Sequence, residues 1–186
     1  MRWDQLFADL ELQLDAAAEG ELDAEVAERT RRAVASTSLD GRLRAATGRA
    51  IELSVAGAGA IAGVVRRVGS GWLLLDVRGA LPAVVATRLV VSVRDLPVAA
   101  RELPNGDDAG PETGLVPVLR VLTRDRTPTS LVLVDGATFT GTIDRVGIDY
   151  LDLAEHPLDE PRRSSSLRGV RTLSLRGIAV VRPRLE

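Results

Sequence analysis

Six arginines are the residues of this chain whose type and position are suited to chemistry, and that chemistry is the binding of phosphate. A guanidinium group is always charged and presents several N–H donors, so it contacts phosphate oxygens well. Four of the six occupy equivalent places in two copies of a repeated sequence. The candidate residues for binding nucleic acid are Arg67, Arg88, Arg145, Arg162, Arg163 and Arg176.

The arginines each have a second interpretation. Arg67 and Arg145 are either symmetric phosphate contacts, or residues whose stems cover apolar surface or whose heads pair with an acid at the junction of helix and barrel. The cluster that holds Arg162 and Arg163 is either a phosphate site or part of a solvated loop, because two acids precede it. All 24 basic residues are Arg, which we attribute to codon usage and not to phosphate binding.

Little in the chain is suited to catalysis. His156 is the only histidine and lies next to a proline, where we expect a surface residue and not a base or ligand. The absence of Cys excludes disulfides, thiolate metal sites and cysteine nucleophiles. The glycines fall in predicted β turns and form no phosphate-binding loop before a helix. We therefore expect no enzyme activity, cofactor, metal site or small-molecule substrate.

A repeated motif positions these residues. It reads Gly-x-[Val/Ile]-x-Arg-Val-Gly-x-x-[Trp/Tyr]-Leu-x-Leu and occurs at Gly63–Leu75 and, 78 positions later, at Gly141–Leu153. Further on, the match resumes at an offset of 88, so that Arg88 corresponds to Arg176. The ten additional residues lie within Glu155–Arg168, a polar stretch that we expect to be an exposed, mobile loop. The pattern predicts an internal duplication.

Each copy is predicted to be a small barrel of five short strands. A short helix or turn is expected just before each barrel, at Leu39–Thr47 and Leu115–Thr123, and Asp135-Gly136 is a strong hairpin signal. Gly63, inside a predicted strand, indicates a bulge or sharp bend. The predicted strands are 51–55, 61–68, 72–77, 82–87 and 90–93 in the first copy, and 129–134, 137–146, 150–154, 170–175 and 178–182 in the second.

The chain is thus predicted to be mainly β with N-terminal helices, an α+β protein in four parts. Residues 1–36 form an acidic helical segment, 37–96 a first barrel, 97–114 a linker rich in Pro and Gly, and 115–186 a second barrel. No run of apolar residues approaches the ~20 needed to span a membrane, and no early run has the form of a signal peptide. We expect a cytoplasmic protein without membrane contact.

The charge is unevenly distributed. Residues 1–28 carry nine acids and one Arg, a net charge of −8, whereas the remainder carries +6. Such asymmetry is typical either of an acidic segment that guards a nucleic-acid surface, or of charge used for solubility and pairing across a fold. The apolar face of the first predicted helix is expected either to dock within the chain or to mediate dimerisation.

The stretch Val134–Leu153 resembles the first motif of the Sm/Hfq-like superfamily of small SH3-type barrels. Both have an apolar strand, an Asp-Gly or Asn-Gly turn, a Gly-x-Ile pattern, a short turn and an apolar third strand. Arg176-Gly177 before Ile178–Val181 resembles a short form of the second motif. The resemblance covers 39–96 and 115–182 and implies two tandem Sm-like barrels. The whole chain also resembles conserved proteins of high-GC actinobacteria, from which no function follows.

In Sm-like proteins a basic residue of the second motif contacts RNA phosphate. The resemblance implies this role for Arg176 and, with a weaker match, for Arg88, because Leu89 replaces the motif's Gly. The family's Asp-x-x-x-Asn signature is absent from both copies. Sm-like subunits also pair the fourth strand of one barrel with the fifth of the next. The resemblance therefore implies either that the two barrels pair within the chain or that several chains close a ring.

Two functional hypotheses follow. The first is a non-enzymatic protein-interaction or scaffold module, whose strand edges bind an unknown protein partner or a second copy of the chain. The second is an RNA-binding protein whose acidic N-terminal helices limit non-specific binding. Exposed apolar strand edges between the barrels would favour the first, and a continuous Arg surface would favour the second. Trp72 and Tyr150 are expected to serve as barrel core or inter-barrel contacts in preference to base stacking.

Overall fold

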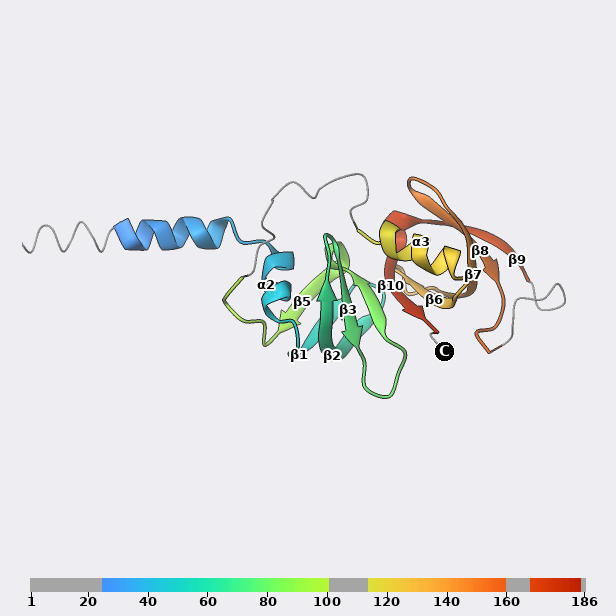
Figure 1. The fold of residues 1–186 in the computed structure, drawn as a ribbon, viewed down its shortest axis with the longest axis horizontal. Coiled ribbons are helices and arrows are strands. Elements are labelled where there is room, and N and C mark those ends of the chain that lie inside the picture. Colours follow the sequence, from blue (N-terminus) through green and yellow to red (C-terminus); the bar gives the residue numbers. More distant parts are fainter. Residues whose placement is uncertain (1–24, 101–113, 160–167, 185–186) are drawn as a thin grey trace, which may run out of the picture. The chain divides into compact units, whose positions relative to one another are not determined.

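The structure of the 186-residue chain is a computed structural model that describes residues 25–100, 114–159 and 168–184 (Figure 1). It divides into two compact units, Met1–Thr37 and Ser38–Glu186. The predicted helix before residue 25, most of the predicted linker and the pair Arg162 and Arg163 lie outside the described residues. Within the described ranges no helix has the length and apolar character needed to cross a membrane.

The described part of the first unit is a helix over residues 25–35, where the sequence predicts one. Arg29 pairs with Glu25 at 2.6 Å, and Glu28 accepts from both Arg31 and Arg32. These pairs stand three or four residues apart, the spacing that brings side chains together on a helix surface. Each is exposed and contributes a few tenths of a kcal/mol at most.

The second unit is mainly β, with two short helices. The ten strands that the sequence predicts are all present, and their ends lie within two residues of the predicted ones. A first half contains α2 and β1–β5, and a second half contains α3 and β6–β10. The elements are α2 (Leu39–Ala45), β1 (Ala50–Val55), β2 (Gly59–Val68), β3 (Trp72–Asp76), β4 (Ala83–Ala86), β5 (Val90–Arg94), α3 (Val116–Arg124), β6 (Pro128–Leu133), β7 (Thr138–Val146), β8 (Tyr150–Glu155), β9 (Gly169–Ser174) and β10 (Ile178–Pro183).

The strands form one open antiparallel sheet in the order β5-β1-β2-β3-β4-β10-β6-β7-β8-β9. The order within the first half is repeated within the second. The sequence predicts two separate barrels, whereas the strand pairing gives a continuous ten-stranded sheet that is not closed into a barrel. The difference arises because β4 pairs with β10 of the other half, which joins the two groups of strands.

Each half places a short helix before its strands. Ser38 caps α2, since its Oγ accepts from the Gly41 N–H at 2.9 Å. In α3, Pro117 occupies the first turn, where a missing N–H costs nothing. Leu43 of α2 and Leu119 of α3 are both fully buried.

The predicted distortion of β2 lies beyond Gly63. Pairing with β3 shifts register between Val65 and Arg67, and β7 shifts against β8 between Ile143 and Arg145, the equivalent place. Gly63 is required for another reason, because a Cβ there would lie 2.5 Å from the Asp76 carbonyl oxygen of β3. Arg67 and Arg145 therefore each lie directly after a β-bulge, at the point where the strand register shifts.

Two apolar cores are present, and each contains residues of both halves. The first core includes Ala179 and Val180 of β10, although most of its residues come from β1–β4. The second includes Val84 and Ala86 of β4 together with residues of α3 and β6–β10. This exchange means that neither half completes its core alone.

Candidate functional site

The two halves meet at a short, fully buried strand junction. Val84 of β4 lies opposite Val181 of β10, and Val85 lies opposite Val180. All four side chains are at most 3% exposed. Of the two alternatives implied by the Sm-like resemblance, pairing of a fourth strand with a fifth strand within one chain is therefore present.

Arg88 spans this junction from the turn that follows β4. Its Nη2 donates to three carbonyl oxygens of the second half, those of Leu175 at 2.6 Å, Arg176 at 2.9 Å and Ile178 at 3.1 Å. These acceptors belong to the 3₁₀ turn Leu175–Gly177 and the start of β10. Burial lowers the pKa of the Arg88 guanidinium from its ordinary value. Its carbonyl contacts thus tie the two halves together.

The other predicted arginines that the structure describes have guanidinium groups without a hydrogen-bond or ion-pair partner among the described residues. Arg67, Arg145 and Arg176 are exposed, and none makes a side-chain hydrogen bond or ion pair with the described residues. By contrast, the neighbouring Arg66 pairs with Asp76. The alternative in which Arg67 and Arg145 pair with acids is therefore not observed in the described part of the chain.

A hollow of about 530 Å³ brings two of the predicted arginines together. Arg88 and Arg176 both line it, next to Asp149, whereas Arg67 and Arg145 do not. The described arginines therefore do not all share one cavity. The full lining is Gly71, Arg88, Gly114, Leu115, Val116, Ile148, Asp149, Leu175 and Arg176.

The aromatic residue of each motif lies over a glycine of the preceding turn. A Cβ on Gly69 would lie 2.2 Å from the Trp72 ring, and a Cβ on Gly147 would lie 2.3 Å from the Tyr150 ring. Trp72 is also packed against the second core, which includes Ala86, its partner on the neighbouring strand β4. Packing of Trp72 against a core agrees with the prediction that it serves as core or as a contact between the barrels, and does not decide between the two.

The outermost strands of the sheet, β5 and β9, each have one paired side. Among the strands of the described ranges, β5 pairs with β1 alone, and β9 pairs with β8 alone. Val91 of β5 is 71% exposed and Val170 of β9 is 66% exposed. The exposed apolar edges that the sequence hypothesis places between the barrels are therefore found at the two ends of the sheet. Unpaired edges of this kind accept another strand through main-chain hydrogen bonds.

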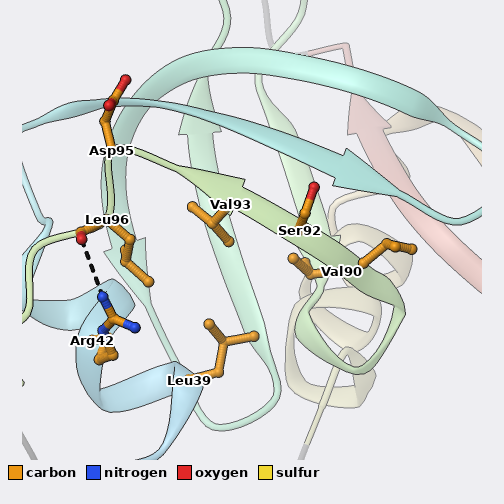
Figure 2. A pocket seen from close by; sticks show the side chains of 8 residues that line it. Leu39, Arg42, Val90, Ser92, Val93, Asp95 and Leu96 are labelled. Carbon is orange, nitrogen blue, oxygen red and sulfur yellow. Dashed lines mark hydrogen bonds between the residues drawn. The ribbon is translucent and has the colours of Figure 1, made fainter.

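A groove of about 400 Å³ runs along β5 beside α2 (Figure 2). Leu39 and Arg42 of α2 form one wall, and Val90–Val93 form the other. Arg42 donates to the carbonyls of Leu96 at 3.1 Å and Pro97 at 3.0 Å, which holds the segment after β5 against the helix. The groove and the open edge of β5 form one continuous surface.

His156 is buried, and the prediction of a surface histidine is wrong. The side chain is 1% exposed, with Nε2 2.8 Å from Thr142 Oγ1 and Nδ1 2.8 Å from the Pro157 carbonyl oxygen. A carbonyl can only accept, so Nδ1 donates a hydrogen bond to Pro157, while Nε2 shares a hydrogen bond with the threonine hydroxyl. The strand β8 extends to Glu155 and carries His156 inward, and no residue pattern in the sequence indicates this.

The described residues contain no cluster of three or more His, Asp or Glu that could hold a metal ion. His156 uses both ring nitrogens inside the fold, which leaves neither of them open to a substrate. The chain matches no protein-family model and no curated protein.

Proposed function

We propose that this protein is a non-enzymatic interaction module built from two tandem Sm-like units, which binds protein through the open edges of β5 and β9. One observation carries the proposal. The strands that join the two halves are buried, whereas their counterparts at the ends of the sheet have a partner strand on one side only among the described strands, and most of their residues are exposed.

The counterparts are identified by position. The 3₁₀ turn Thr87–Leu89 precedes β5, and the turn Leu175–Gly177, numbered 88 higher, precedes β10. β9 is thus the counterpart of β4, and β5 is the counterpart of β10. Every residue of β4 is buried, whereas five of the six residues of β9 are exposed. The same structural position supports strand pairing in one half and lacks a partner in the other.

Charged substitutions at the two edges test the proposal. In a Val91→Lys, Val170→Lys double variant, both exposed valines become lysines, which oppose edge pairing without disturbing a core. We expect chemical cross-linking to trap the wild type in complexes with protein. The double variant should form none of these complexes. Val121→Lys is the matched control, because Val121 is an exposed valine on α3, away from both edges. Association that survives the double variant would contradict the proposal.

Binding of single-stranded RNA is the second candidate function. It is favoured by Arg67 and Arg145, which occupy the same exposed position in both motifs and have no acidic partner among the described residues. Under this alternative, RNA affinity falls steeply as salt rises. The Arg67→Ala, Arg145→Ala double variant would lower the slope of log affinity against log salt by about 1.4. A full-length protein that does not bind a labelled RNA pool at low salt excludes this function.

A further inference from the structure

We propose that the groove along β5 binds an extended segment of another protein. The segment adds to the sheet as a strand antiparallel to β5, and it carries a basic residue followed by small apolar side chains at alternate positions. This inference rests on the proposed function and names the chemistry of its partner. The groove has a filled equivalent within the chain, which shows what kind of segment it accepts.

The backbone of β5 is arranged like that of a strand that pairs on both sides. Val93 of β5 lies opposite Leu53 of β1. Val181 of β10 lies opposite Leu131 of β6, and these residues are numbered 88 and 78 higher. Both pairings shift register near the start of β5 and of β10. Because β10 also accepts β4 on its other side, the open edge of β5 can accept a strand in the same way.

Two alternate side chains of β4 fill the equivalent space in the second half. Val84 and Ala86 stand two positions apart, so they point to the same face of β4. Both are buried in the second core, which also contains Leu119 of α3 and Val181 of β10. A strand beside β10 therefore supplies small apolar groups at alternate positions to the core that α3 covers.

The corresponding space in the first half is open. Leu39 of α2, Val93 of β5 and Leu96 surround it (Figure 2). Leu39 is 38% exposed, and Val91 of β5 is 71% exposed. Covering such side chains is favourable in proportion to the apolar area removed from water. A segment with the alternating pattern of β4 provides that cover.

The free strand β9 of this chain carries unsuitable side chains for the groove. β9 is the counterpart of β4, and Thr172 and Ser174 occupy the positions of its two alternate apolar residues. Burial of these hydroxyls against Leu39 would remove them from water without supplying hydrogen-bond partners, which costs free energy. The partner is therefore a segment of another protein and not a second copy of this chain.

A charge at the end of the groove indicates the direction of the segment. Asp95 follows the last residue of β5, is exposed, and makes no side-chain hydrogen bond or ion pair with the described residues. Arg42, the other charged residue that lines the groove, donates to the carbonyls of Leu96 and Pro97. The N-terminal end of an antiparallel strand lies beside Asp95, so a basic residue there precedes the alternating apolar residues.

Fluorescence anisotropy of labelled, end-capped peptides with the full-length protein tests the pattern. The probe is Lys-Thr-Val-Thr-Val-Thr, and the control Lys-Thr-Thr-Val-Val-Thr has the same composition with adjacent valines. We expect the probe to bind at least about tenfold more tightly, because only one valine of the control can face the groove.

A charge placed in the groove should weaken binding of the probe. Leu39→Glu should raise its dissociation constant at least about tenfold. Val121→Glu changes an exposed apolar residue of α3 outside the groove and should leave the dissociation constant unchanged. Circular dichroism would verify that both variants are folded.

Backbone methylation of the probe tests strand pairing without any change to the protein. Alternate N–H groups of an extended strand point to the same edge, so methylation of the valine amides or of the threonine amides removes the donors on one edge only. One of these two peptides should lose binding and the other should keep it. Equal affinities of the two would overturn strand pairing.

Moving the lysine to the other end of the probe tests the direction. Thr-Val-Thr-Val-Thr-Lys should bind about two- to fivefold more weakly, which is the size of an exposed ion pair. Asp95→Asn should remove the difference between the two peptides. A difference that persists in this variant would overturn the role of Asp95.

The outcomes separate this inference from the proposed function. Equal affinity for the probe and the control, or no binding of either, overturns the inference. The proposed function still stands in that case if the wild type forms complexes with protein that the Val91→Lys, Val170→Lys variant loses. Complexes that survive in this double variant overturn the proposed function itself. Self-association of the wild type that competes with the probe would assign the groove to a second copy and overturn the choice of partner.

Discussion

Replacing Arg88 by Ala should weaken the connection between the two halves of the sheet. The Nη2 nitrogen of Arg88 lies within 3.1 Å of three carbonyl oxygens of the second half. It carries two hydrogens, so it makes about two full bonds at a time. Hydrogen bonds from a charged donor contribute about 1.5–3 kcal/mol each, and partial exposure favours the low end of this range.

The expected loss in the free energy of unfolding is therefore about 2–3 kcal/mol for Arg88→Ala. In a domain of this size, each kcal/mol lowers Tm by about 2–4 °C, so the fall in Tm should be about 4–12 °C. Urea denaturation followed by circular dichroism gives the free energy directly, and thermal melting gives Tm. Both belong at low protein concentration, where contacts between chains do not contribute.

Arg176→Ala is the matched control, because it removes the same side chain from the counterpart turn. Arg176 makes no side-chain contact of this kind with the described residues, so the single chain should lose less than about 0.5 kcal/mol. Equal effects at the two positions would refute the assignment of Arg88 as the residue that ties the halves together. The same assignment would be refuted if the Arg88→Ala variant had the same free energy of unfolding as the wild type.

Two other predictions concern the second half. Gly141→Ala should destabilise the chain by about 3 kcal/mol or more in urea denaturation, because its Cβ would lie 2.0 Å from the Ala154 carbonyl oxygen. Gly177→Ala, with open space at the Cβ, should cost less than about 1 kcal/mol, and equal losses would contradict this explanation. The ¹⁵N NMR spectrum of the single histidine, His156, should show a proton on Nδ1, the nitrogen that faces the Pro157 carbonyl. A proton on Nε2 alone would contradict the described geometry.

The sequence is sufficient to predict the strands, because most are short runs rich in apolar residues that turn residues separate. Alternation of Ile51, Leu53 and Val55 with polar residues indicates β1, and these three side chains are buried. The repeated motif also predicts that Arg67 and Arg145 are equivalent, and both lie just beyond a register shift. Local patterns were enough for these elements because local turns and burial determine them.

Features that depend on contacts between distant residues could not be predicted from the sequence. The role of Arg88 depends on carbonyls that lie 87 to 90 residues away along the chain, and no local pattern encodes that distance. His156 is buried because Thr142 and Pro157 supply its hydrogen bonds, whereas its neighbours in the sequence suggest a polar loop. The continuous sheet likewise depends on which strands pair across the halves.

The two copies of the repeat differ most where their surroundings differ. Val84 and Ala86 of β4 are buried in the second core, and their counterparts Thr172 and Ser174 of β9 are exposed. An end strand as apolar as β4 would be prone to uncontrolled pairing with other chains. Polar side chains lower that tendency but keep the main-chain donors and acceptors of the edge available.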